Sequence, residues 1–228
     1  MIFFDIETVP SAKATLAKQW VDHCRRLDIC NRTVEAGTER TKQASLHPAF
    51  CQVVCICAES DYGSALYECG ADERGVLAKF AQFVGSDASA VLCGHNIKSF
   101  DIPVLACRYL AHGMRLPPAL QVLGKKPWEI QHVDTCELLR FGGGPRISLD
   151  AACLMLGIDS PKDSMAGSDV AEAFAAGRFA DIAAYCAGDV LAVRKIVECL
   201  NEIGATGTVS GRSRAPQSRM PLNQGHGR

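Results

Sequence analysis

The sequence lacks the features that would indicate a membrane or secreted protein. No apolar run reaches the roughly 20 residues that a membrane-spanning helix needs. The chain passes directly from Met1 to the apolar residues before Asp5, without the basic stretch and small-residue cleavage site of a signal peptide. Apolar residues make up 48% of the chain and charged residues 21%, as in a typical soluble domain. We therefore expect a cytoplasmic protein that does not associate with membranes.

The twelve cysteines also lack a recognisable pattern, because no two of them have the C-x-x-C spacing of zinc or redox motifs. The densest group is Cys51, Cys55 and Cys57, and it lies in an apolar run. A free cysteine in such a run behaves as a small buried hydrophobe. We therefore expect reduced thiols in the core of the protein, and neither a disulfide framework nor a zinc site.

Two further absences limit the phosphate chemistry that the chain could perform. The glycines at 142–144 are not followed by the Lys-Ser or Lys-Thr of a P-loop, and no pair of histidines has ligand spacing. Both absences argue against an unrelated phosphatase or nucleotide hydrolase.

The net charge of −1 conceals an uneven distribution along the chain. Residues 204–228 contain four arginines and no acid, so removing +4 from −1 leaves −5 for residues 1–203. An acidic body is a poor generic binder of nucleic acid, but it suits a site in which several carboxylates bind divalent cations. The end segment is rich in Gly, Ser, Thr, Pro and Arg, and has too few apolar residues to offset its ordering entropy. We expect one folded domain over residues 1–203 and a disordered basic tail over 204–228.

The apolar pattern predicts an α/β fold. Short apolar or alternating runs predict strands at 2–6, 52–58, 64–69, 90–93 and 133–135. The turn at 61–63 joins the second and third of these strands into a hairpin. Apolar faces at helical spacing predict helices at 12–27, 71–84, 100–112, 148–156, 169–176 and 181–203. Early strands followed by alternating helices indicate a mixed sheet flanked by helices.

The first motif that carries chemistry is Asp5-Ile6-Glu7. Side chains alternate along a strand, so the two carboxylates point to one face, about 7 Å apart along the backbone. Oxygen ligands of this kind suit Mg²⁺ or Mn²⁺. A D-x-E triplet also arises by chance in a chain of this length. Two acids at the end of an otherwise apolar strand, however, are costly unless they are paired or bind a metal.

The second motif runs from Gly94 to Pro103 and joins a buried strand to the start of a helix, where open α/β sheets place their sites. Asp101 is the candidate metal ligand in it, although a helix-capping role is the common alternative. Asn96 is the candidate substrate contact, with a turn residue as the alternative. We interpret His95 as a structural loop residue.

The third motif is Tyr185 and Asp189, four residues apart on the predicted last helix, which places the hydroxyl and the carboxylate side by side. Between them, Gly188 costs helix stability of about 1 kcal/mol relative to Ala, and would let another backbone or a substrate approach closely. Taken alone, this motif would favour an ordinary exposed Asp.

Together the motifs resemble motifs I (D-x-E), II (N-x-x-x-F-D) and III (Y-x-x-x-D) of the DEDD exonuclease superfamily, in the same order. Tyr185 in place of His is typical of the DEDDy branch. The sequence resembles in particular the predicted 3′–5′ exonucleases related to the proofreading domain of family B DNA polymerases. The resemblance covers about residues 1–203, including the familiar segments 45–48, 148–150 and 167–170. It implies an RNase H-like fold with a mixed five-stranded sheet flanked by helices.

The resemblance also implies a mechanism. The enzyme would remove nucleoside 5′-monophosphates from the 3′ end of single-stranded nucleic acid, with DNA favoured and RNA left open. It would use two divalent cations, Mg²⁺ or Mn²⁺, about 3.5–4 Å apart. The implied metal ligands are Asp5, Glu7, Asp101 and Asp189. Tyr185 would orient the attacking water. The implied substrate-binding residues are Thr8, Asn96 and Phe100.

The main alternative is a non-catalytic nucleic-acid-binding module on the same fold. The five implied catalytic residues are all intact, and a degenerate copy would have no reason to retain them. We see no polymerase module in the sequence, so we expect a free-standing exonuclease.

Overall fold

The structure is a computed structural model that describes residues 1–11, 19–20, 22–23, 43–160 and 165–204. Most of the predicted helix at 12–27, nearly all of the polar stretch after it, and the predicted tail beyond Gly204 lie outside the described residues. None of the helices within the described ranges is long and apolar enough to cross a membrane.

The described elements follow the predicted order closely. The strands are β1 (Ile2–Pro10), β2 (Cys51–Ser60), β3 (Ala65–Cys69), β4 (Leu92–Gly94) and β5 (Val133–Asp134). The α-helices are α3 (Glu73–Val84), α4 (Asp101–Ala111), α5 (Thr135–Leu138), α6 (Leu149–Leu156), α7 (Val170–Ala175) and α8 (Phe179–Glu202). Short 3-10 turns are η2 (Pro118–Leu120), η3 (Pro127–Glu129) and η5 (Gly167–Asp169).

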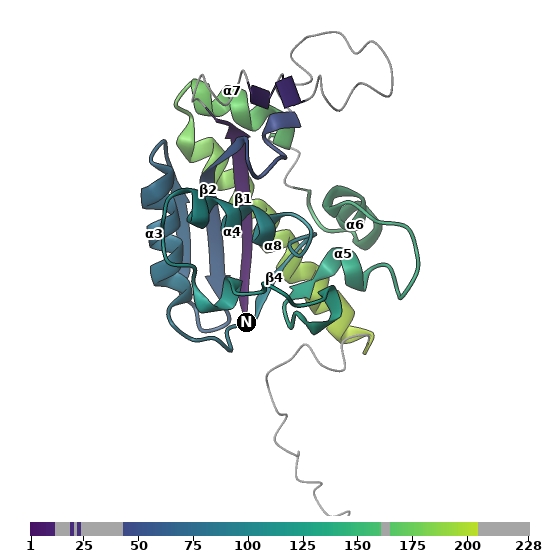
Figure 1. The fold of residues 1–228 in the computed structure, drawn as a ribbon. Helices are drawn as coiled ribbons and strands as arrows, with labels where there is room; N and C mark the ends of the chain where they lie inside the picture. The colour runs from purple at the N-terminus through teal and green to yellow at the C-terminus, as the bar shows by residue number, and fades with distance from the viewer. Residues whose placement is uncertain (12–18, 21, 24–42, 161–164, 205–228) are drawn as a thin grey trace, which may run out of the picture.

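The five strands form one mixed sheet in the order β3-β2-β1-β4-β5. β1 pairs antiparallel with β2, and β2 pairs antiparallel with β3, so the predicted hairpin is confirmed. On its other side β1 runs parallel to β4, which runs parallel to β5. Figure 1 shows α3 and α4 on the near face of the sheet and α8 behind it. This mixed five-stranded sheet between helical layers is the RNase H-like fold that the resemblance implied.

The central strand β1 is longer than the sequence pattern predicted. Its pairing with β2 continues from Ile2 opposite Ser60 to Pro10 opposite Cys51, across an irregularity between Glu7 and Thr8. The expectation that the two acids lie at the end of this strand is therefore wrong. They lie inside it, because the long antiparallel partner keeps the backbone extended beyond them.

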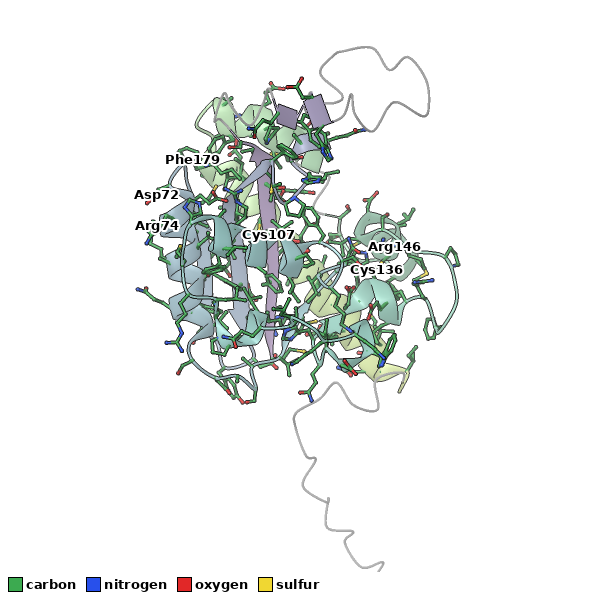
Figure 2. All side chains as sticks on the ribbon, in the orientation of Figure 1. Asp72, Arg74, Cys107, Cys136, Arg146 and Phe179 are labelled. Atoms are coloured by element: carbon green, nitrogen blue, oxygen red, sulfur yellow. The ribbon has the colours of Figure 1, made fainter. Side chains whose placement is uncertain are left out.

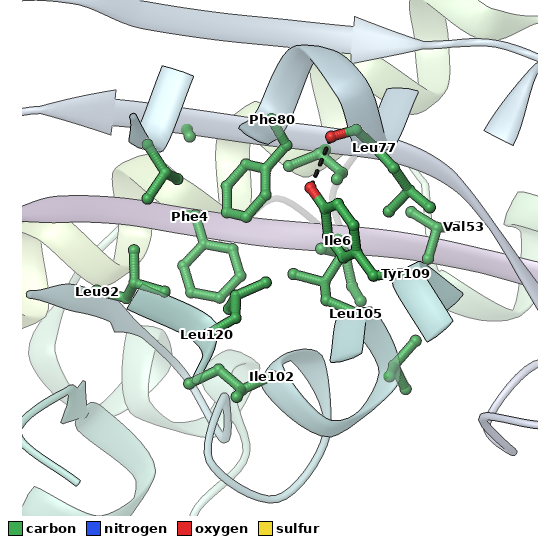
Figure 3. Packing of buried hydrophobic residues seen from close by; sticks show 14 of the residues in the cluster. Phe4, Ile6, Val53, Leu77, Phe80, Leu92, Ile102, Leu105, Tyr109 and Leu120 are labelled. Atoms are coloured by element: carbon green, nitrogen blue, oxygen red, sulfur yellow. Dashed lines mark hydrogen bonds between the residues drawn. The ribbon is translucent and has the colours of Figure 1, made fainter. Parts of the chain in front are cut away.

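Alternation along β1 divides the core into two apolar clusters. Phe4 and Ile6 belong to the cluster beneath α3 and α4. Figure 3 shows its packing, including the hydroxyl of Tyr109 donating a hydrogen bond to the carbonyl of Leu77, with 2.6 Å between the oxygens. Phe3 belongs to the second cluster, which β1 and β2 form with α7 and α8. Side chains alternate along a strand, so Asp5 and Glu7 point to the same face of the sheet as Phe3 and therefore face α8.

A buried ion pair fixes α3 and α4 to the sheet. Arg108 donates two hydrogen bonds of 2.7 Å to the carboxylate of Glu73, and both side chains are about 6% exposed. The backbone N–H of Val53 donates to the same carboxylate at 2.8 Å. The near-face helices are thereby held to β2, next to the strand that carries the two acids.

Gly94 ends β4 in a space with no room for a side chain. A Cβ at this position would lie 2.8 Å from the carbonyl oxygen of Phe4, and would also collide with the Cγ2 atom of Ile97. Both neighbours belong to the packed core, so neither can move away cheaply.

We predict that Gly94→Ala lowers the free energy of unfolding by about 1–3 kcal/mol, the usual cost of overpacking a core. Gly70→Ala is the matched control, because a Cβ there would meet nothing within 4 Å. Urea denaturation of both variants measures the difference. Equal stability of the two variants would contradict this account of Gly94.

Candidate active site

Three carboxylates from two elements meet on the far face of the sheet. Asp5 and Glu7 project from β1 and are half-buried, whereas Asp189 projects from α8 and is 9% exposed. One carboxylate oxygen from each of the three lies within 4.8 Å of the other two. The structure therefore brings together three of the four sequence-predicted metal ligands.

Asp101 approaches this group from the opposite helical layer. It is the first residue of α4 and is 3% exposed, and the backbone of Ile6 hydrogen-bonds to its carboxylate. The residue before it is the helix N-cap, and no side-chain cap bond is formed there. Asp101 is therefore not the N-cap residue itself, although its carboxylate also accepts a hydrogen bond from its own backbone N–H in the first turn. Its carboxylate lies outside the 4.8 Å cluster, yet it is close enough to Asp5 and Glu7 to repel both.

The site holds several carboxylates, which carry like charges, close together in a buried space. Burial, followed by repulsion from Asp189 and Asp101, raises the pKa of both Asp5 and Glu7 well above their usual values. Burial raises the pKa of Asp101 to about 7. Close carboxylate oxygens that resist ionisation are a donor set that fits a hard divalent cation, because the cation offsets their repulsion.

Tyr185 lies one helical turn before Asp189, as predicted, and is 7% exposed. Its hydroxyl hydrogen-bonds to the carboxylate of Asp189. Burial and the neighbouring carboxylates raise the pKa of Tyr185 above its usual value, so the phenol stays protonated at neutral pH. Gly167 of η5 lies beside it, since a Cβ there would be 3.6 Å from the hydroxyl oxygen.

A cavity of about 280 Å³ lies along the part of β1 that follows the two acids. Thr8, which follows Glu7 on β1, contributes to its wall, together with Ser45 and Gly167. The hydroxyl of Thr8 donates a hydrogen bond of 2.7 Å to the carbonyl of Ser45. This bond joins β1 to the segment that contributes Ser45 to the wall of the cavity.

The loop of the second motif is held by a buried carboxylate that sequence reasoning missed. Asp134 is 2% exposed and accepts hydrogen bonds from three backbone N–H groups. These belong to Asn96 at 2.7 Å, Lys98 at 3.0 Å and Cys136 at 3.0 Å. The only sequence signal was its place as the N-cap of a short helix after a strand.

Asn96 and Phe100 are the other two predicted substrate contacts. Unlike Thr8, neither of them lines the 280 Å³ cavity. Asn96 adopts a left-handed backbone with φ of 66°, as the turn alternative expects, and its side-chain oxygen accepts a hydrogen bond from Arg146. Both residues line a separate open cavity of about 420 Å³, near which Figure 2 labels Arg146 and Cys136. Phe100 is half-buried and packs against the near-face core.

His95 is a structural residue, as predicted. One ring nitrogen lies 3.0 Å from the hydroxyl of Thr135 and the other lies 3.0 Å from the carbonyl of Ile147. Both nitrogens are therefore engaged, and the ring joins the second motif to the segment before α6.

A comparison with known protein families shows to which family the chain belongs. A family model described as a predicted 3′-5′ exonuclease related to the exonuclease domain of PolB matches residues 45–194. The chain belongs to this family. The matched range contains Asp101, Tyr185 and Asp189. Asp5 and Glu7 precede the matched range, and the fold itself places them beside Asp189.

Solved structures agree with the family at the level of the fold. The family B DNA polymerase from the hyperthermophilic archaeon Pyrobaculum calidifontis is similar, with a TM-score of 0.59 and 19% identity. The similarity covers 90% of this chain and 25% of the polymerase chain, so this chain spans about a quarter of the length of that protein. No curated protein matches the chain.

We predict that the metal-free protein loses stability as the pH rises. A carboxyl whose pKa is higher in the folded state binds more protons when folded, so stability falls between its unfolded and folded pKa values. For Asp101 this interval runs from 3.8 to about 7. Melting temperatures measured with a chelator from about pH 5 to about pH 8 should fall more steeply for the wild type than for Asp101→Asn.

Two controls belong to this measurement. Glu198→Gln changes an exposed acid on α8 and should keep the wild-type slope. Excess Mn²⁺ should flatten the wild-type decline, because a cation bound to the folded state stabilises the ionised carboxylates. Identical slopes in all three proteins would show that the site carries no electrostatic strain.

Proposed function

We propose that this protein is a metal-dependent 3′→5′ exonuclease that releases nucleoside 5′-monophosphates from single-stranded nucleic acid, DNA in preference to RNA. The observation that carries the proposal is the convergence of Asp5, Glu7 and Asp189 within 4.8 Å. Membership of the family supports the class of reaction. The geometry supports the acidic site that such a reaction needs.

The carboxylates would hold two divalent cations, Mg²⁺ or Mn²⁺. Asp5, Glu7 and Asp189 are close enough to share one ion, and Asp101 on the opposite side is the candidate ligand for a second. When bound, such ions neutralise charge on the reacting phosphate and lower the pKa of a bound water. Bound cations would neutralise the four acids, which otherwise repel one another in a partly desolvated space.

Tyr185 would position the attacking water. Its raised pKa keeps the proton on the phenol at neutral pH, so it can donate and accept hydrogen bonds but is a poor general base. The hydrogen bond to Asp189 restricts the rotation of the ring and fixes where the hydroxyl lies. A group that orients the nucleophile contributes mainly in the transition state.

The cavity lined by Thr8, the residue after Glu7, is the candidate site for the terminal nucleotide. Its walls include the small residues Gly167, Ser168 and Ala171, which permit a sugar or base to approach the backbone closely. The hydroxyl of Thr8 lies at this wall, which supports its proposed contact with the nucleotide. Contacts from Asn96 and Phe100 stay predictions, since both lie away from this cavity.

Digestion of a 5′-labelled single-stranded DNA oligonucleotide with Mg²⁺ or Mn²⁺ tests the proposal. We predict a ladder that shortens one nucleotide at a time, with slower cutting of a blunt duplex because unpairing the end costs a few kcal/mol. A matched RNA oligonucleotide measures the preference between the two nucleic acids. If circular single strands are cut as fast as linear ones, the protein is an endonuclease.

The non-catalytic alternative is tested with a pair of variants on the same helix. Asp189→Asn removes a carboxylate from the cluster and should abolish nearly all turnover, while binding of the oligonucleotide persists. Glu198→Gln removes an exposed charge from α8 and should keep wild-type turnover. Binding without turnover in the wild type, under every divalent cation tried, would favour the non-catalytic module.

For Tyr185→Phe we predict a loss of kcat of about 10²–10⁴-fold, the usual contribution of a group that handles the reacting proton or water. KM should change little, because the hydroxyl acts chiefly in the transition state. Steady-state kinetics on a defined oligonucleotide measure both constants. An unchanged kcat would reduce Tyr185 to a packing residue.

A further inference from the structure

A cluster of thiols lies beside the carboxylates, because Cys57 and Cys55 on β2 stand opposite Asp5 and Glu7 on β1. Cys55 and Cys57 alternate with Ile56 along β2, so both face α8, where Cys186 lies against them. The three side chains are fully buried, and their sulfur atoms all lie within 4.8 Å of one another. All three are free thiols.

The spacing of these sulfurs is compatible with a metal site. The sulfurs of Cys55 and Cys57 are 3.9 Å apart. In a tetrahedral site with Zn–S bonds of about 2.3 Å, two sulfurs are separated by about 3.8 Å. Packed thiols can also touch at this distance, so the convergence of three buried sulfurs on one point, and not this single distance, indicates a ligand set.

A fourth thiol lies next to the cluster. Cys69 on β3 stands opposite Cys55 in the sheet, and the two side chains hydrogen-bond to each other. Cys69 is half-buried, whereas the three clustered cysteines are fully buried. It lies outside the group in which every sulfur is within 4.8 Å of the others.

We propose that Cys55, Cys57 and Cys186 form a binding site for a soft divalent cation such as Zn²⁺, separate from the oxygen site beside it. Thiolates select soft cations, whereas carboxylates suit Mg²⁺ and Mn²⁺, so the two sites discriminate between the two classes of ion. On binding, each coordinating thiol releases its proton to solvent and forms a sulfur–metal bond. No oxidant or reductant is required.

The two sites are joined through a single side chain. The thiol of Cys186 lies 3.5 Å from the carboxylate and 3.4 Å from the backbone carbonyl of Asp5, both as hydrogen-bond acceptors. A metal-bound thiolate has no proton to donate, so occupation of the thiol site removes these bonds from Asp5. If the proposed nuclease function holds, Zn²⁺ at this site lowers the rate of DNA cleavage.

Cadmium is the probe for the thiol site, because cadmium–thiolate bonds absorb in the ultraviolet and carboxylates bound to cadmium do not. The full-length reduced protein is titrated with Cd²⁺ in excess Mg²⁺, which occupies the oxygen site. We expect the band to saturate at one equivalent. Cys57→Ala and Cys55→Ala should each weaken binding by more than the roughly 10–100-fold that loss of a group supporting a ligand costs.

The control variants isolate the cluster. Cys107→Ala changes an exposed cysteine on α4, labelled in Figure 2, and should keep the saturating band. Asp189→Asn disables the oxygen site and should also keep it. Melting temperatures measured without metal show whether Cys55→Ala and Cys57→Ala fold. If one of them does not, the cadmium titration of the other tests the thiol site. Absence of the band in the wild type, or its persistence in both folded alanine variants, overturns the proposal.

The spectroscopic result does not depend on turnover, so the thiol site and the nuclease function can fail separately. If the wild type cleaves DNA, micromolar Zn²⁺ added with excess Mg²⁺ should inhibit it more strongly than it inhibits Cys57→Ala. Equal inhibition of the two proteins would place the effect of Zn²⁺ at the carboxylates and contradict the coupling through Cys186.

Discussion

The repulsion among Asp5, Glu7 and Asp189 is the interaction to which the rest of the site is adjusted. Their oxygens lie within 4.8 Å of one another in a partly desolvated space, and burial and mutual repulsion raise the pKa values of the two β1 acids. Left to themselves, the side chains would turn toward water. They are kept together because they extend from β1 and α8, which pack against each other in the far-face apolar cluster.

The two apolar clusters on either side of β1 supply that rigidity. The near-face cluster and the buried Glu73–Arg108 pair hold β2 and the helices α3 and α4 in place. The far-face cluster fixes α8 and thereby the direction of Tyr185 and Asp189. Side chains that are already in position before the substrate binds need not move during the reaction. Electrostatic catalysis depends on polar groups that are preorganised in this way.

Local periodicity explains which parts of the site could be predicted from the sequence. The common face of Asp5 and Glu7 follows from the two-residue period of a strand, and the contact between Tyr185 and Asp189 follows from the turn of a helix. The hairpin followed from a turn signal. The length of β1 was missed because the pairing partner decides it, and a partner strand is not visible in the local pattern.

The features that sequence reasoning missed depend on contacts between distant segments. Asp134 binds the backbone of Asn96, 38 residues away, and no local pattern distinguishes it from an ordinary helix cap. The thiol cluster unites Cys55 and Cys57 with Cys186 through the packing of α8 on β2, so their spacing along the chain carries no metal signature. The sequence indicated that the cysteines of β2 are buried in the core, but not that two of them meet Cys186.

The most direct test of the account is a crystal structure of the protein with Mn²⁺, measured with X-rays at which manganese scatters anomalously. The account predicts an anomalous peak between Asp5, Glu7 and Asp189, with metal–oxygen distances of about 2.0–2.6 Å. It predicts that the peak disappears in Asp189→Asn, while the positions of β1 and α8 stay the same. A wild-type crystal that contains Mn²⁺ at the surface but none among these carboxylates would contradict the central claim that they form one metal site.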